Sequence, residues 1–397
     1  MRFFNTAGPV NCRKHYCLPP LERFDLSEIE ALLAQEKYFV LHAPRQTGKT
    51  SCMLALMDYL NTQGQYRALY CNVEAAQAAR EDVEQSMNDI LREMARKAQI
   101  YLQDNFLDDN KYRFLERGGY GTALATALSE WAEALDKPLI ILVDEIDSLI
   151  GDSLISVLRQ LRSGYTQRPK HFPQSIILCG VRDVRDYRIH SSSTKEIITG
   201  GSAFNIKAES LRLGDFIQPE VESLLIQHTQ ETGQEFIPEA THCIWHLSQG
   251  QPWLVNALAY ETCFRMKEGR DRSLTIKKEM VDQAKENMIA RRETHLDQLG
   301  DKLQEERVQR VIAPMLEGLD LNVRLDDLQY VQDLGLIKET SQGPRISNPI
   351  YAEIIPRELT VSEQANLEAR YEQAWYIRTD GSLDTNKLIS AFQEFFR

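Results

Sequence analysis

The segment Ala43–Thr50, with the sequence APRQTGKT, carries the residue types that can hold a polyphosphate. A triphosphate needs inward-pointing backbone N–H donors, a helix N-terminus aimed at its charge and one cation near its outer phosphates. Gly48 allows close backbone approach, Lys49 supplies the cation, and Thr50 supplies a hydroxyl ligand for Mg²⁺. The residues predicted to bind nucleotide in this loop are Ala43, Pro44, Arg45, Gln46, Thr47, Gly48, Lys49, Thr50 and Ser51.

The first position of this motif departs from the usual glycine, because Ala43 stands there. Alanine can adopt a negative-φ version of that turn, so we expect nucleotide binding to survive. The alternative is an ordinary strand–helix turn that contains Gly-Lys-Thr and binds nothing. The flanking pattern favours the phosphate loop, because it predicts a short strand at Tyr38–His42 and a helix from Gly48 to Leu60.

A pair of carboxylates follows the apolar run Leu139–Val143. The run predicts a buried strand, which delivers Asp144 and Glu145 to the edge where open parallel sheets bind their ligands. We expect Asp144 to hold Mg²⁺ and Glu145 to orient and polarise an attacking water, with Lys49 as the second catalytic group. Two acids at a strand end are common surface residues in isolation, but together with the upstream Gly-Lys-Thr they predict a nucleotide site.

The elements around these residues alternate between helical and strand patterns from Leu26 onward, which predicts a parallel α/β sheet with helices on both faces. We expect Ser27 to cap the first helix with Glu30 completing a capping box, and Asp109–Gly121 to be a loop. The predicted strands are Tyr38–His42, Tyr66–Val73, Leu139–Val143, Ser175–Val181 and Phe204–Ser210, and a long helix is predicted over Ala75–Leu102.

The pattern after Leu211 is helical only and predicts a lid domain, followed by helices and a β-hairpin around Ser341–Pro349 that fit a winged helix. The final forty or so residues read as an amphipathic helical tail. The predicted domains are the core with its N-terminal extension at 1–210, the lid at 211–292, the winged-helix-like unit at 293–357 and the tail at 358–397.

The composition of the 397 residues is that of an ordinary globular protein, with 46 basic and 58 acidic residues and a net charge of −12. This balance argues against a general polyanion binder. The N-terminus has no apolar signal region and no run approaches the ~20 apolar residues of a membrane span, so we expect a cytoplasmic protein without a membrane partner. Seven scattered cysteines favour reduced, packed thiols over a disulfide framework, and over metal ligation by Cys12, His15 and Cys17.

The motifs taken together resemble the AAA-like P-loop ATPases related to the STAND and archaeal-ATPase groups, near the origin-recognition branch of AAA+ proteins. The matching segments are Ala43–Thr50, Leu139–Asp147, Ile177–Tyr187 and Gln249–Trp253. The resemblance implies ATP as the nucleotide and a lid helix that opens at Pro252 near the base. It also implies that Tyr16, Arg23 and the NTAGP segment from Asn5 border the adenine.

The resemblance further places Arg182 at the position where related proteins carry a polar contact to the γ-phosphate. This chain departs from the usual Asn, Ser or Thr there, and a surface ion pair between Arg182 and Asp183 is the alternative. An arginine finger would stabilise charge on the transferred phosphoryl group across a homo-oligomer. The candidates for such a finger are Arg162, Arg168, Arg185 and Arg188.

Three functional interpretations remain open: a hydrolytic ATPase that couples nucleotide state to the core, lid and winged helix; a slow STAND-type switch or scaffold; and a DNA-binding loader or defence-type ATPase. Residues 301–357 contain seven basic and ten acidic side chains. This charge balance makes a protein partner a better fit than DNA for the winged-helix-like unit. The chain shows no nuclease constellation of the Asp…Glu-x-Lys type, so a nuclease would have to come from a partner.

Overall fold

The computed structural model describes residues 1–184, 187–190, 197–291, 294–318, 323–370 and 382–395. Its centre is a five-stranded sheet in the order β4-β5-β6-β3-β9, with all neighbouring strands parallel. The strands are β3 (Tyr38–His42), β4 (Arg67–Asn72), β5 (Leu139–Asp144), β6 (Ser175–Gly180) and β9 (Lys207–Arg212). A parallel sheet of this order brings the carboxyl ends of β3 and β5 to one edge, where the two predicted motifs follow their strands.

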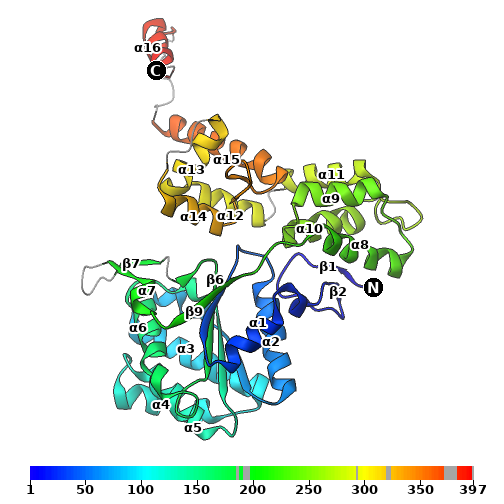
Figure 1. The fold of residues 1–397 in the computed structure, drawn as a ribbon. Helices are drawn as coiled ribbons and strands as arrows, with labels where there is room; N and C mark the ends of the chain where they lie inside the picture. Colours follow the sequence, from blue (N-terminus) through cyan, green and yellow to red (C-terminus); the bar gives the residue numbers. More distant parts are fainter. Residues whose placement is uncertain (185–186, 191–196, 292–293, 319–322, 371–381, 396–397) are drawn as a thin grey trace.

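Both faces of the sheet are covered, which explains why its central strands read as continuous apolar runs. Along β5, Leu139, Ile141 and Val143 belong to one buried cluster, while Ile140 and Leu142 belong to the other. Figure 1 shows α1 and α2 on one face and the remaining core helices on the other. The core helices are α1 (Leu26–Ala34), α2 (Lys49–Gln63), α3 (Val83–Lys97), α4 (Phe106–Gly118), α5 (Ala123–Ala134), α6 (Gly151–Ser163) and the short α7 (Gly200–Ala203). Beside them, β7 (Arg188–His190) pairs in an antiparallel manner with β8 (Ile197–Thr199).

Three local predictions about the core are wrong. The helix predicted over Ala75–Leu102 is interrupted, because Arg80 has a positive φ of 53° and α3 begins only at Val83. Asp25 caps α1 by accepting a hydrogen bond from the Glu28 backbone N–H at 3.1 Å, so Ser27 already lies inside the helix. The predicted loop over 109–121 is largely helical, because α4 places Leu107 and Phe114, seven residues apart, on one face that the main core buries. Between these two apolar residues the sequence is mostly polar, so the helical spacing of the buried face is difficult to recognise from the sequence.

The second half of the described chain is mainly helical, as predicted, and ends in helices around a small antiparallel hairpin. Its elements are α8 (Gln218–Thr232), α9 (Pro238–Ser248), α10 (Pro252–Tyr260), α11 (Lys278–Ala290), α12 (Thr294–Leu303), α13 (Glu306–Glu317), α14 (Leu325–Asp333), β10 (Ile337–Lys338), β11 (Arg345–Ile346), α15 (Pro349–Arg370) and α16 (Thr385–Phe395). None of the described helices is long and apolar enough to cross a membrane.

The lid (α8–α11) and the C-terminal unit (α12–α15) share one hydrophobic core. Val221 and Leu254 of the lid belong to the same buried cluster as Ile312 and Ile355 of the C-terminal unit. The predicted boundary between residues 357 and 358 falls inside α15, so a single helix crosses it. The division into four domains stays a prediction. Because the lid and the C-terminal unit share a core, we expect them to move together.

The N-terminal extension packs on the lid, where β1 (Phe3–Phe4) pairs in parallel with β2 (His15–Tyr16). The chain turns just before β2, and Cys12 and Cys17 on either side of this turn form a disulfide with Cα atoms 5.3 Å apart. The prediction of seven reduced thiols is therefore wrong for this pair, because a chain reversal between them brings the two side chains together. The five other cysteines are free and buried.

Two glycines of the lid permit a test of how its shared core is held. Gly233 and Gly250 both have positive φ, at 75° and 81°. A Cβ at Gly233 would meet nothing within 4 Å, whereas a Cβ at Gly250 would lie 1.9 Å from the Phe216 carbonyl oxygen. We expect Gly233→Ala to lower the free energy of unfolding by about 1 kcal/mol, and Gly250→Ala to lower it by about 3 kcal/mol.

Urea unfolding followed by tryptophan fluorescence measures both values, because Trp245 and Trp253 lie in the lid. The two variants carry the same backbone strain, so the difference between them isolates the close approach of Gly250 to Phe216. Equal losses of stability would contradict the described packing.

Candidate functional site

The phosphate-loop segment closes on itself around the Lys49 side chain. Lys49 Nζ donates hydrogen bonds to the carbonyl oxygens of Ala43 and Pro44, each at 3.0 Å, and the Thr47 hydroxyl donates to the Pro44 oxygen at 2.8 Å. Lys49 is the first residue of α2, so its ammonium group lies close to the N-terminus of this helix. This places two sources of positive potential together, as an anion site requires.

The backbone of the loop turns at Gln46 and Gly48, with φ of 59° and 95°. Ala43 has a negative φ, as expected for alanine at this position. Its N–H donates to the Gly180 carbonyl oxygen at 3.2 Å, which ties the loop to the end of β6. The loop therefore needs glycine at Gly48 and not at its first position.

The carboxylate of Asp144 is fully buried at the end of β5, and both of its oxygens accept hydrogen bonds. Its Oδ2 accepts from the Thr50 hydroxyl at 2.7 Å and from the Tyr70 hydroxyl at 2.9 Å. Its Oδ1 accepts from the Glu145 backbone N–H at 3.0 Å. The structure thus brings Thr50 and Asp144, the two predicted metal ligands, into direct contact.

The backbone of Glu145, the next residue, has a φ of 57°, in the left-handed region. A non-glycine residue keeps this strained conformation only where the surrounding structure fixes it. Its side chain lines the cavity together with Lys49 and Thr50. Burial raises the pKa of Glu145, and the nearby charge of Lys49 lowers it in part. A carboxylate whose pKa moves toward neutral pH is a better proton acceptor than an exposed one.

A cavity of about 350 Å³ runs from the phosphate loop toward the lid, and its volume is typical of small-molecule sites. One end is polar, formed by the loop, Lys49 and Glu145, and the other is more apolar, with Phe216, Leu224 and Trp253. Further lining residues are Asn5, Thr6, Ala7, Gly8, Pro9, Val10, Tyr16, Cys17, Leu18, Pro20, Arg23, Glu74, Pro252 and Asn256. A polar end for phosphates and an apolar end for a base is the layout that a nucleotide needs.

The N-terminal strap, defined here as residues 5–18, forms one wall of this cavity. The Trp253 indole N–H donates to the Thr6 carbonyl oxygen at 3.0 Å, and the Val10 N–H donates to the Ser51 hydroxyl at 2.9 Å. The strap therefore joins α10 of the lid to α2 of the core. Ser51, which follows the phosphate loop in the sequence, is the residue of α2 that the strap contacts.

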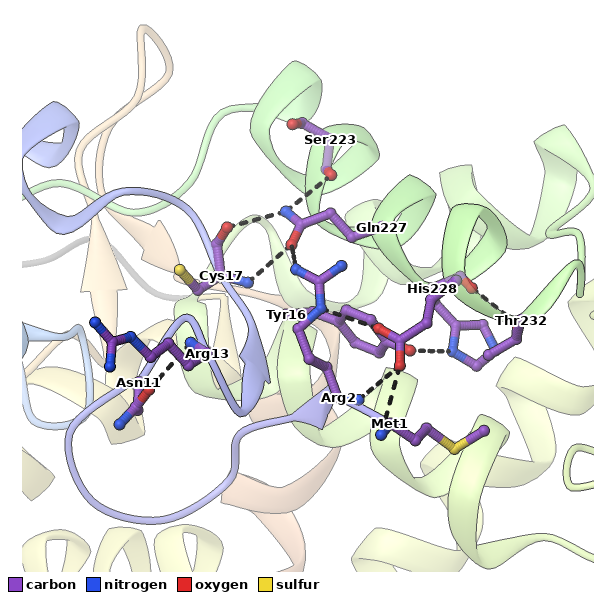
Figure 2. A network of polar contacts seen from close by, with 11 residues as sticks. Met1, Arg2, Asn11, Arg13, Tyr16, Cys17, Ser223, Gln227, His228 and Thr232 are labelled. Carbon is purple, nitrogen blue, oxygen red and sulfur yellow. Dashed lines mark hydrogen bonds and ion pairs between the residues drawn. The ribbon is translucent and has the colours of Figure 1, made fainter.

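The strap is also attached to α8 of the lid. The Gln227 side chain pairs with Cys17 in both directions, accepting from its N–H at 3.1 Å and donating to its carbonyl oxygen at 2.9 Å. Figure 2 shows Cys17 and Tyr16 facing Gln227 and His228, with the Tyr16 hydroxyl 3.2 Å from His228 Nδ1. Movement of α8 and movement of the strap are therefore coupled.

Arg23 links the phosphate loop to the connection between core and lid. Its guanidinium donates to the Thr47 carbonyl oxygen at 3.2 Å and to the Gly214 carbonyl oxygen at 2.6 Å. It also lies 4.4 Å from the centre of the Phe216 ring, within the range of a cation–π contact. Tyr16, Arg23 and Pro252 all line the cavity, and their place beside an adenine base stays a prediction.

Arg182 lies elsewhere: the described residues that line the cavity do not include it. Its guanidinium sits over the rings of Tyr187 and Tyr330, 4.7 and 4.8 Å from their centres. Tyr330 belongs to α14, so Arg182 joins the end of β6 to the C-terminal unit. Asp183 is buried and pairs with Lys207, so the alternative of a surface pair does not describe it.

The finger candidates have different surroundings. Arg162 donates to the Ser202 carbonyl oxygen at 3.2 Å, and Arg168 stacks over Tyr165 at the opposite end of the sheet from the phosphate loop. Both arginines thus contact groups of their own chain. Arg185 lies outside the described residues, as does the side chain of Arg188.

Sequence reasoning missed Tyr70, Trp253 and Asn256 at this site. Tyr70 reads as an ordinary aromatic residue in a buried strand, and its contact with Asp144 appears only when β4 pairs with β5. Trp253 directly follows Pro252, and its position in the first turn of a lid helix was the available signal.

Comparisons with known proteins agree with this geometry. The family model described as an AAA-like domain matches residues 21–355. The fold is similar to that of the Walker-type ATPase of Pyrococcus abyssi, at 14% identity and a TM-score of 0.55, over 89% of this chain and 99% of that one. It is also similar to the ORC2 protein of Aeropyrum pernix, solved as ADPNP–ADP complexes, at 14% identity and a TM-score of 0.51, over 90% and 96%.

A search of curated proteins found no match. The two structural similarities confirm the predicted fold class, an α/β P-loop core followed by a helical lid and a winged-helix unit.

The raised pKa of Glu145 gives a pH test of the site. Because the folded protein holds this proton more tightly than the unfolded chain, ionised Glu145 destabilises the fold at pH above its unfolded pKa. We expect Glu145→Gln to raise the melting temperature at pH 8, and the gain to disappear as the pH falls below about 4.3, the ordinary value for glutamate.

Differential scanning calorimetry across this pH range measures the difference. Glu74→Gln is the matched control, because Glu74 lines the same cavity but is exposed. A Glu145→Gln variant that is less stable than the wild type at pH 8 would contradict the burial of this carboxylate.

Proposed function

The chain belongs to the AAA-like domain family, and we propose that it is an ATPase that binds ATP with Mg²⁺ in the cavity and hydrolyses it to ADP and phosphate. The observation that carries the proposal is the contact of 2.7 Å between the Thr50 hydroxyl and the buried Asp144 carboxylate, beside Lys49. Hydroxyl and carboxylate oxygens are the hard ligands that Mg²⁺ takes in phosphate-transfer sites.

The residues present fit a Mg²⁺-bound triphosphate. Thr50 and Asp144 would hold the ion, which neutralises phosphate charge when it is bound. Lys49 lies among backbone carbonyls at the N-terminus of α2, where the released carbonyl contacts can be exchanged for phosphate oxygens. Asp144 is fully buried, so a cation at this position would also offset the burial of a negative charge.

Glu145 has the position and the chemistry of the group that activates water. Its side chain lines the cavity on the same side as Lys49, and burial raises its pKa. A carboxylate in this state accepts a proton more readily and orients a water by hydrogen bonding. Lys49 stabilises the negative charge of the transferred group.

The apolar end of the cavity suits an adenine ring. Phe216, Leu224 and Trp253 supply apolar surface there, and the strap supplies backbone groups from Asn5 to Val10. Pro252 begins α10 at the same end, as the resemblance implies for the base-proximal lid helix. Adenine as the preferred base rests on this resemblance.

Coupling to the C-terminal unit is supported by a close contact behind the phosphate loop. Gly335 has φ of 78°, and a Cβ there would lie 2.8 Å from Pro44 Cβ and Cγ. The turn between α14 and β10 therefore packs its backbone directly on the loop. Tyr330 lies between Arg182 and Arg307, with its ring centre 4.8 and 3.8 Å from the two guanidinium carbons. A shift of the loop or of the β6 end would move this unit.

The same contacts favour a slow nucleotide switch as the second candidate function, because a loop held by a separate unit must break these contacts to change state. The loader hypothesis has less support. Arg310 of the C-terminal unit pairs with Glu306 and Asp327, and Arg307 also pairs with Asp327, so acidic neighbours offset the charge of both cations.

Phosphate release from ATP, measured at steady state for wild type, Lys49→Ala and Glu145→Gln, tests the proposal. We expect Glu145→Gln to bind ATP and to turn over at least about 100-fold more slowly, since general-base groups contribute that much. Lys49→Ala is expected to lose binding. Glu74→Gln, the control at the exposed cavity wall, is expected to keep wild-type turnover.

Double-stranded DNA is added in parallel to separate the interpretations. Turnover that DNA stimulates would support the loader. ATP binding that depends on Lys49 without any turnover would support the switch. Turnover that Lys49→Ala and Glu145→Gln leave intact would contradict the assignment of this cavity.

A further inference from the structure

The structure assigns to Tyr70 the role of a positioning residue for Mg²⁺: its hydroxyl holds the Asp144 carboxylate so that Oδ2 faces Thr50. This inference rests on the proposed function of the cavity and names a determinant of its metal affinity. Neither of the two sequence motifs contains Tyr70, which lies on β4 and not on the strands that carry the phosphate loop and the acids.

The register of the sheet explains how Tyr70 reaches this position. β4 pairs with β5 so that Tyr70 lies opposite Leu142 and Asn72 lies opposite Asp144. Residues two apart on a strand share a face, so Tyr70 projects on the face of Leu142 and Asp144. Tyr70 and Leu142 belong to the same buried cluster beneath α2. The length of the tyrosine side chain then carries its hydroxyl along the strand to the carboxylate, at 2.9 Å.

The electrostatics of a buried carboxylate make this contact consequential. Asp144 is fully buried, and a buried charge without hydrogen bonds is strongly unfavourable. Thr50 and Tyr70 both donate to its Oδ2, and the lone pairs of the Thr50 oxygen would in addition serve a metal ion. The Tyr70 hydroxyl comes from a separate strand and holds the orientation of the carboxylate independently of Thr50.

Tyr70 acts on Asp144 as a hydrogen-bond donor, because the phenolic O–H donates and the carboxylate oxygen accepts. On the other neighbouring strand, the Cys179 thiol also contacts the Asp144 carboxylate. A thiol is a weak hydrogen-bond donor, so Cys179 does not replace the tyrosine hydroxyl.

The test is the Mg²⁺ dependence of nucleotide binding by Tyr70→Phe, which removes one oxygen and keeps the ring. Binding of a fluorescent ATP analogue is measured in EDTA and then along a MgCl₂ titration. We expect the affinity in EDTA to stay within about twofold of wild type, and the half-saturating Mg²⁺ concentration to rise about tenfold, as when an outer-shell partner of a metal ligand is lost.

Tyr38→Phe is the matched control. Tyr38 is also fully buried in the central sheet, and its hydroxyl donates to the Pro173 carbonyl oxygen at 3.1 Å, at the end of β3 away from the phosphate loop. This variant loses a buried hydroxyl as Tyr70→Phe does, so it reports any general effect on stability. We expect it to keep the wild-type Mg²⁺ dependence.

A second variant tests whether Tyr70 acts through Asp144. In an Asp144→Asn background, adding Tyr70→Phe is expected to produce no further change in Mg²⁺ dependence, because residues in one hydrogen-bond network are not additive. An additive tenfold effect there, or a wild-type Mg²⁺ dependence of Tyr70→Phe alone, would overturn the inference. Failure of the proposed function looks different: wild type would then bind the analogue no better than Lys49→Ala.

Discussion

The hydrogen bond between Thr50 and Asp144 is the interaction around which the rest of the molecule is arranged. It joins the first turn of α2 to the end of β5, at 2.7 Å, across the carboxyl edge of the sheet. The carboxylate can be buried there because the Thr50 and Tyr70 hydroxyls and the Glu145 backbone N–H donate to it. Its fixed place determines where a metal ion, and with it the phosphates of a nucleotide, can sit.

The segments that hold the phosphate loop come from all parts of the chain. Arg23 contacts it from the N-terminal extension, the strap reaches Ser51 beside it, and Gly335 packs on Pro44 from the C-terminal unit. Figure 1 shows the lid and the C-terminal unit above the carboxyl edge of the sheet. Because these two share one core, a change at the loop acts on them as a connected body.

The local parts of this arrangement could be predicted from the sequence. The strand Tyr38–His42 and the acids after Val143 follow from apolar runs that end in polar groups, and the structure has the same strand bounds for β3. Gly48 is required by its positive φ, which the motif already implies. Such features depend on neighbouring residues alone, and so their pattern is visible in one sequence.

The parts that depend on distant contacts could not be predicted. The helix α4 forms because the core buries Leu107 and Phe114, and Tyr70 reaches Asp144 only because β4 pairs with β5. Arg182 occupies a position that the resemblance links to phosphate, yet it contacts Tyr330, almost 150 residues away in the sequence. The residues near Arg182 in the sequence do not predict this contact with Tyr330.

The strap contacts Ser51 beside the phosphate loop and the C-terminal unit contacts Pro44 within it, so we expect nucleotide binding at the loop to protect both. Hydrogen–deuterium exchange with and without Mg²⁺ and ATP, for wild type and Lys49→Ala, measures this protection. We expect slower exchange at residues 5–18, 43–52 and 325–338 in wild type and no change in Lys49→Ala. Protection confined to residues 43–52, or the same protection in Lys49→Ala, would contradict it.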